Sequence, residues 1–170
     1  MIRRCVSEDE QKWCELNLEF MAYEYEDGNV WENPIKKGNP GDIFKEIIND
    51  KKSPNLLFFV EEDGKVIGFI NTAWFQSVWA HGKVLFIDDF FILEEFRGKG
   101  YGEKAILELE NRMKEEGYKR FQLLAEDTNP KAIKFYNKNN YSKQKILIKV
   151  TEFLGYMDIC FLKLIGAYKK

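Results

Sequence analysis

The apolar and polar positions in the first fifty residues predict one short strand and two helices. Residues 2–6 can form the strand, after which Ser7 is a candidate N-cap with Glu10 at capping-box spacing. The helix that follows carries apolar side chains only roughly at helical spacing, and it ends in an acidic and aromatic stretch at residues 23–28. After a loop with glycines and prolines, residues 42–50 place their apolar side chains on one side of a second helix.

The pattern changes to strands from residue 56 onward. Residues 56–61 and 66–75 are largely apolar runs on either side of Asp63-Gly64, a typical hairpin turn. A second turn at residues 80–83 leads into residues 84–93, a long β-branched and aromatic run that we expect to be buried on at least one face. Two consecutive hairpins would make these three strands antiparallel to one another.

The rest of the chain begins with helical spacing. Apolar side chains recur at three- and four-residue steps within residues 102–116, and Gly117 is a candidate helix stop. The later elements that we expect are a strand at 121–125, a helix at 129–137 with Pro130 in its first turn, and closing strands at 146–150 and 157–164. The sum is a single α+β (mixed α/β) domain over residues 1–170, built around one largely antiparallel sheet.

Composition narrows the classes of function. The chain has 26 basic and 28 acidic residues, so no strongly basic field supports nucleic-acid binding. Cys5, Cys14 and Cys160 show no metal-ligand spacing, and one histidine cannot complete a typical zinc site. No apolar run reaches the length of a membrane span, and no apolar signal segment follows the first methionine. We therefore expect a cytoplasmic protein with no metal, nucleic-acid or membrane partner.

The segment with the most chemical information is the glycine turn at residues 97–102, which joins the long strand to a helix. Its residues are Arg97, Gly98, Lys99, Gly100, Tyr101 and Gly102. Alternate glycines permit positive φ and let several backbone N–H groups point into one concavity, which suits an anion. The helix N-terminus and the two basic side chains add to this attraction. The turn therefore predicts a diphosphate ligand, and a flexible loop with a positive rim is the alternative.

Two segments carry a resemblance to a known family. Residues 90–102 resemble the acetyl-CoA-binding motif of the GNAT acetyltransferase superfamily, in which a strand is followed by Arg/Gln-x-x-Gly-x-Gly/Ala. Residues 129–141 resemble that family's N-x-x-A-x-x-F-Y-x-K-x-G-F segment, except that Asn140 stands for the usual glycine and Tyr141 for the usual phenylalanine. The change at Asn140 is mild, because Asn tolerates positive φ better than most residues. The resemblance covers most of the chain and implies an acetyl-CoA-dependent N-acetyltransferase.

The resemblance also implies where the cofactor would bind. Its pantetheine arm is expected to lie between two splayed parallel strands, with the Ile92 N–H placed to polarise the thioester carbonyl. The amides from 98 to 102 are expected to hold the pyrophosphate. The other positions implied to contact the cofactor are the main chain of Phe90, Phe91 and Ile92, together with Asn129 and Ala132.

Tyr136 matches the family's usual general acid, near the coenzyme sulfur. The alternative for this residue is a core tyrosine that packs beside Phe135. C-terminal strands often pair between subunits in the family, which implies a homodimer.

Two carboxylates, Asp88 and Asp89, lie inside the long strand, where they are costly without a task or a partner. An amine substrate must lose a proton before it attacks, and a carboxylate can accept that proton. Strand alternation predicts that the two point to opposite faces, with Asp89 on the side of Ile87 and Phe91. The resemblance favours Asp88 as the group that contacts or deprotonates the amine. Hydrogen bonds to a neighbouring loop are the alternative for either one.

The acceptor is indicated by a narrower resemblance. Residues 86–92 and 21–27 are similar to segments of spermidine/spermine-type and diamine acetyltransferases, which implies that Glu24 contacts a cationic substrate along with Asp88 and Asp89. Carboxylates among aromatic rings attract ammonium groups, so we expect a polyamine or a similar small cation. An aminoglycoside, a protein N-terminus or a lysine stays open as the acceptor. A solvated helix end is the alternative for residues 23–27, and a non-catalytic acyl-CoA-binding module is the alternative for the whole protein.

Overall fold

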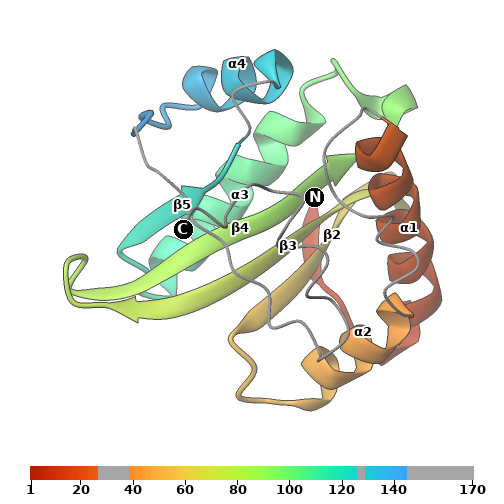
Figure 1. Ribbon diagram of the computed structural model, residues 1–170, viewed down its shortest axis with the longest axis horizontal. Coiled ribbons are helices and arrows are strands. Elements are labelled where there is room, and N and C mark those ends of the chain that lie inside the picture. Colours follow the sequence, from red (N-terminus) through yellow and green to blue (C-terminus); the bar gives the residue numbers. More distant parts are fainter. Residues whose placement is uncertain (27–38, 126–128, 145–170) are drawn as a thin grey trace, which may run out of the picture. The chain divides into compact units, whose positions relative to one another are not determined.

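The computed structural model of the chain describes residues 1–26, 39–125 and 129–144. Two compact units divide the chain, residues 1–133 and 134–170, and the first contains the sheet (Figure 1). Across the described ranges, no helix is both long enough and apolar enough to cross a bilayer. The strands predicted at 146–150 and 157–164 lie outside the described residues.

Within the described residues, five strands form one sheet in the order β1-β2-β3-β4-β5. Their bounds are β1 (Ile2–Arg4), β2 (Asn55–Glu62), β3 (Lys65–Ser77), β4 (Gly82–Ile92) and β5 (Arg120–Leu123). Neighbouring strands are antiparallel, except that β4 and β5 are parallel. Both predicted hairpins are confirmed, and Asp63 and Gly64 make the first turn with φ values of 48° and 74°.

Helices account for most of the remaining described chain. They are α1 (Glu10–Glu26), α2 (Pro40–Asn49), α3 (Tyr101–Glu115) and α4 (Pro130–Lys138), with 3₁₀ turns η1 (Ser7–Asp9) and η3 (Glu94–Phe96). The predicted N-cap at Ser7 is wrong, because Ser7 lies inside η1 and the capping side chain is that of Asp9. The Val6 N–H donates to Asp9 Oδ2 at 2.8 Å, one turn before α1 begins.

The sheet buries a different cluster on each face. Helices α1 and α2 cover one face with Trp13, Leu16 and Phe44, which pack against strand side chains that include Phe69 and Phe91. On the other face, α3 packs against β1 and β4 and buries four apolar residues at helical spacing: Ala105, Ile106, Leu109 and Met113. Full burial of a Leu, Ile, Phe or Met side chain contributes about 1.5–3 kcal/mol to stability. These two clusters therefore hold the sheet between its helices.

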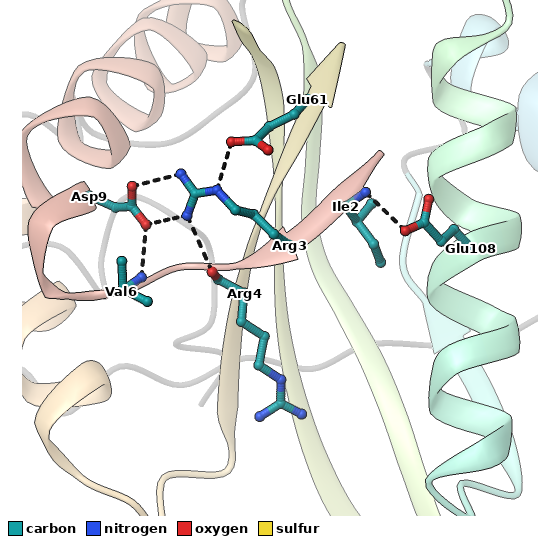
Figure 2. A network of polar contacts seen from close by, with 7 residues as sticks. All are labelled: Ile2, Arg3, Arg4, Val6, Asp9, Glu61 and Glu108. Carbon is teal, nitrogen blue, oxygen red and sulfur yellow. Dashed lines mark hydrogen bonds and ion pairs between the residues drawn. The ribbon is translucent and has the colours of Figure 1, made fainter. Parts of the chain in front are cut away.

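The short strand β1 is fastened to its surroundings by polar contacts (Figure 2). The guanidinium of Arg3 donates to both carboxylate oxygens of Asp9 and, through Nε, to Glu61 Oε1 at 2.7 Å. On the opposite side of the strand, the Ile2 N–H donates to Glu108 Oε1 of α3 at 3.2 Å. These contacts join β1 to η1, to β2 and to α3. They add to the few main-chain hydrogen bonds that a strand of only three residues can make.

Strands β3 and β4 approach each other very closely at Gly68. A Cβ placed on this glycine would lie 2.2 Å from the main-chain oxygen of Phe91 and 2.9 Å from Cδ1 of Ile92. Main-chain atoms cannot give way as a flexible side chain does, so no larger residue fits unless β4 shifts. Gly68 therefore sets the position of the end of β4.

Candidate functional site

The parallel pairing of β4 with β5 is short. It runs from Val84 with Arg120 to Ile87 with Leu123, whereas β4 continues to Ile92. The last residues of β4 therefore have β3 on one side and no partner from β5 on the other. This matches the splayed pair of parallel strands that the family resemblance implies.

The direction of the main-chain groups at the end of β4 follows from the ladder. The Leu93 N–H donates to Ile67 O at 2.9 Å, and antiparallel hydrogen-bonded pairs alternate along a strand. The main-chain groups of Phe91 therefore point toward Phe69 of β3, whereas those of Phe90 and Ile92 point away from it. Of the three positions predicted to pair with a pantetheine arm, Phe90 and Ile92 thus direct their main-chain groups to the β5 side.

The predicted alternation of Asp88 and Asp89 is wrong in one respect, because β4 has a bulge at this point. Ile87 pairs with Thr72 and Asp89 pairs with Asn71, so two steps along β4 match one step along β3. Asp88 is the extra residue. Since Asn71 and Thr72 face opposite sides of the sheet, Asp89 does not share a face with Ile87, and it lies instead on the side of Phe91.

The glycine turn precedes α3 and has the conformation that its sequence predicts. Gly98 and Gly100 have φ values of 73° and 84°, and Gly100 is the N-cap of α3. A Cβ on either glycine would meet nothing within 4 Å, so the requirement for glycine there is conformational and not a matter of packing. Positive φ at alternate residues followed by a helix N-terminus gives a concavity of N–H donors that fits a pyrophosphate.

Arg97 has a contact that sequence analysis does not predict. Its Nε donates to Ile92 O at 2.7 Å, and its guanidinium carbon lies 5.0 Å from the ring centre of Tyr23 and 5.2 Å from that of Phe91. The side chain therefore fastens the glycine turn to the end of β4 and to α1. Lys99 lies over the ring of Phe96 at 5.6 Å, on the exposed side of the turn.

The acidic residues lie near one another at the end of β4. Burial raises the pKa of Asp89 to about 6, a hydrogen bond from Asn71 opposes that rise, and the charges of Asp88 and Glu24 add to it. Asp88 is more exposed, although partial desolvation also raises the pKa of its carboxyl group. Glu24 is partly buried near the C-terminal end of α1. The three carboxylates predicted to bind substrate thus come from α1 and β4.

The start of α4 is well capped. Asn129 Oδ1 accepts a hydrogen bond from the Ala132 N–H at 2.9 Å. Pro130 lies in the first turn, as predicted, and it is the first helical residue. These two predicted cofactor contacts therefore belong to one N-terminal turn.

Tyr136 belongs to the second compact unit. Its ring makes edge-to-face contacts with Phe135 at 5.2 Å and with Tyr141 at 5.4 Å between ring centres. Desolvation raises the pKa of Tyr136 to about 12, so the phenol keeps its proton at neutral pH. Asn140 has a φ of 65°, the left-handed conformation for which the family motif uses glycine.

Sequence analysis did not find the residues that surround Asp89. Trp13, Asn17 and Asn71 form a buried polar cluster that ends on its carboxylate. The available signal was Asn71, a polar residue within an apolar strand, but its partners come from a helix that is distant in the sequence.

The thiol of Cys5 is not a candidate nucleophile, since burial raises its pKa to about 12 and leaves it unreactive. In the parts of the chain that the structure describes, no three His, Cys, Asp or Glu side chains gather as a metal site.

Comparisons with known proteins agree with this geometry. A family model described as the acetyltransferase (GNAT) family matches residues 11–141. An uncharacterized N-acetyltransferase of Archaeoglobus fulgidus is 32% identical over 103 residues, which are 59% of this chain and 68% of the relative.

Solved structures resemble the chain at low sequence identity. A possible acetyltransferase from Clostridium difficile 630 has a TM-score of 0.74 at 18% identity, covering 91% of this chain and 98% of that one. An aminoglycoside acetyltransferase from an uncultured soil metagenomic sample, in complex with sisomicin, has a TM-score of 0.71 at 16% identity, covering 91% and 96%.

These findings answer two questions. The structural neighbours show the fold, which in the described residues contains a mostly antiparallel five-stranded sheet with α1, α2 and α3 packed on its faces. The family model spans most of the chain, including the strand pair, the glycine turn and the start of α4. The chain belongs to the GNAT family of acetyltransferases, and it is an acetyl-transfer enzyme.

Proposed function

We propose that the enzyme moves the acetyl group of acetyl-CoA to a primary amine of a small cation, with a polyamine as the leading choice. The observation that carries this proposal is the acidic cluster of Glu24, Asp88 and Asp89, in which the first two raise the proton affinity of the third. Carboxylates that repel one another are stabilised by a bound cation. A polyamine can present one amine for reaction and its other ammonium groups to these carboxylates.

Acetyl-CoA supplies the activated acetyl thioester. Its pyrophosphate would accept hydrogen bonds from the amides of residues 98–102, which lie on a turn that Arg97 fastens to β4. The Ile92 N–H and the main chain of Phe90 would pair with the pantetheine arm, because they point away from β3. Asn129 and Ala132 would contact the cofactor from the first turn of α4.

Proton transfer needs a base for the amine and an acid for the thiolate. Asp89 suits the base role, because a pKa of about 6 leaves it mostly ionised at neutral pH and yet basic enough to accept a proton. Asp88 would assist by attracting the ammonium from the more exposed side. Tyr136 suits the acid role, because its phenol is protonated at neutral pH.

An aminoglycoside is the second candidate acceptor. The structural neighbour in complex with sisomicin has the same fold and is described as an aminoglycoside acetyltransferase. The same three carboxylates would attract such a ligand. The TM-score of 0.71 supports the fold alone, and at 16% identity the acceptor is a matter for experiment.

A thiol-release assay decides among these acceptors. The purified enzyme is given acetyl-CoA with spermidine, spermine, sisomicin or a lysine peptide. We expect the highest kcat/KM with a polyamine. Activity with sisomicin alone would replace the polyamine by the second candidate, and activity with the peptide alone would remove both.

The variant Tyr136→Phe tests the acid. We expect kcat to fall by about 10²-fold, because the thiolate loses its proton donor, while the Kd for acetyl-CoA stays close to that of the unchanged enzyme. An unchanged kcat would exclude Tyr136 as the acid.

A further inference from the structure

A buried polar cluster connects helix α1 to the carboxylate of Asp89. The Trp13 indole N–H donates to Asn71 Oδ1 at 3.0 Å. Asn71 Nδ2 donates to Asn17 Oδ1 at 2.8 Å and to Asp89 Oδ2 at 2.9 Å. Asn17 Nδ2 in turn donates to the Trp13 main-chain oxygen at 2.8 Å. The cluster thus joins α1, β3 and β4 through side chains.

The orientation of the Asn71 amide is determined by its partners. An indole N–H can only donate, so the atom that faces Trp13 must be the amide oxygen. The amide nitrogen then faces Asn17 and Asp89, and both of its protons are used. A reversed amide would place two oxygens against each other at Asp89 and two donors against each other at Trp13. The cluster therefore presents a donor, and not an acceptor, to the carboxylate.

The burial of these residues makes that arrangement hard to replace. Asn17 and Asn71 are 2% and 8% exposed, and Trp13 is 4% exposed. Water cannot easily substitute for a lost partner in such a place, and a buried amide without a partner is costly. Two of the three buried polar side chains in the described part of the chain belong to this cluster.

We propose that Asn71 is a positioning residue, which holds Oδ2 of Asp89 by a hydrogen bond and leaves Oδ1 as the atom that receives the proton of the amine. The inference rests on the acetyl-transfer role proposed above for Asp89. Because one oxygen is held, the carboxylate presents its other oxygen in one direction. Trp13 and Asn17 act through Asn71, whose amide they keep in the donating orientation.

The charges around Asp89 make this hydrogen bond important. Asp88 from β4 and Glu24 from α1 both disfavour the ionised carboxylate, and burial disfavours it further. Asn71 from β3 is the group that favours ionisation. Without that donor, Asp89 would carry a proton over more of the neutral range and would be a poorer base.

A role in folding alone is the alternative, since the cluster also fastens α1 to the sheet. The variants Asn71→Leu and Asn17→Leu separate the two roles. Each removes one buried amide and leaves a partner unsatisfied, so both should lower stability. Only Asn71→Leu removes the donor to Asp89, because in Asn17→Leu the Asn71 amide still has Trp13 to orient it.

The test is a ¹³C NMR titration of the Asp89 carboxyl carbon in the whole protein without substrate, with the signal assigned by Asp89→Asn. We expect Asn71→Leu to raise the pKa of Asp89 by about one unit and Asn17→Leu to change it much less. Equal pKa changes in the two variants, or none in either, would overturn the proposal.

Asn71→Val gives a second route to the same answer if Asn71→Leu does not fold. Valine also removes the donor to Asp89, and it is smaller than leucine and suits a strand. We expect a rise in the pKa of Asp89 similar to that in Asn71→Leu, and an unchanged pKa would overturn the proposal. The titration needs no acetyl transfer. Inactivity with every amine would therefore contradict the proposed function, whereas the NMR result for Asn71 and Asp89 would not depend on that activity.

The kinetic measurement then connects the cluster to the reaction. The acid limb of kcat/KM against pH should move upward in Asn71→Leu by the same amount as the NMR pKa. A limb that stays in place while the NMR pKa moves would show that Asp89 is not the group that receives the proton.

Discussion

The glycine turn and the acidic end of β4 lie close together in the sequence. The turn is suited to an anion and the acidic end to a cation, and the two achieve this in different ways. The turn uses consecutive main-chain N–H groups, and positive φ at Gly98 and Gly100 is enough to gather them. The acidic end uses side chains from α1, β3 and β4, and Asp89 has its properties only because Asn71 and Glu24 are packed nearby. The anion site is thus encoded locally, whereas the cation site is encoded by tertiary packing.

The largest effect that tests this comparison is the removal of one carboxylate. Asp89→Asn should lower kcat/KM by about 10²–10⁴-fold, because the amine loses its base. Asp88→Asn is the matched control, and it should have a smaller effect because Asp88 is more exposed and is the bulge residue. Thiol release measures both. A larger loss in Asp88→Asn would return the base to Asp88, as the family resemblance suggests.

The pH dependence of stability tests whether tertiary packing raises the pKa of Asp89. Its pKa is about 6 in the folded protein, against about 3.9 for an unfolded chain, so the folded state binds the proton more tightly. The contribution of Asp89 to stability is therefore most favourable below about pH 4 and declines as the pH rises to 6, by at most about 3 kcal/mol. Urea unfolding at pH 4 to 7 should show that Asp89→Asn lacks this decline.

Asp9 provides the opposite control for that experiment. The hydrogen bond from Arg3 lowers the pKa of Asp9, so its contribution is present above its unfolded pKa and is lost as the pH falls. Asp9→Asn should therefore be most destabilised near neutral pH and least at acid pH. Parallel pH curves for the two variants would contradict the assigned directions.

A smaller effect is expected from strain in the glycine turn. Gly100→Val should weaken acetyl-CoA binding by about tenfold or more, because a β-branched residue strongly disfavours a φ of 84°. Gly117→Val is the matched control, since Gly117 has a φ of 87° and equally open space at its Cβ. Calorimetry should give a normal Kd for that control. Equal weakening in both variants would mean that the effect is on folding.

The smallest effect should come from Arg97→Met. This variant loses the bond to Ile92 O and the contact with the ring of Tyr23, but it leaves the amides of the turn in place. An exposed cation–π contact is worth about 0.5–1 kcal/mol, so acetyl-CoA affinity should fall only a few-fold. A loss as large as that of Gly100→Val would show that the Arg97 charge itself binds the cofactor.

The elements were largely predictable from the sequence because their signals are local. The Asp63-Gly64 turn, the helix stop at Gly117 and the glycine turn each depend on conformations that few other residues adopt. The parallel strand pair came from the family resemblance and is confirmed. The N-cap was missed by one residue: the structure has Val6 at that position, and its N–H donates to the Asp9 side chain inside the 3₁₀ turn.

The details of the candidate site were less predictable because they depend on pairing. A bulge at Asp88 arises from the match of β4 to β3, and a strand considered by itself gives no sign of it. The cluster of Trp13, Asn17 and Asn71 joins residues more than fifty positions apart. Arg97 has a charge that suits a phosphate, and only the structure shows that its side chain lies over two rings.

The close approach at Gly68 has a consequence for how variants of this enzyme should be interpreted. Any side chain there would press on the Phe91 carbonyl and displace the strand that carries Asp89 and Ile92. A random library screened for inactive proteins should therefore include substitutions at position 68, although that glycine has no side chain to bind substrate or to move a proton. A variant that still folds with β4 displaced would be catalytically poor, and it could be mistaken for evidence of a ligand contact.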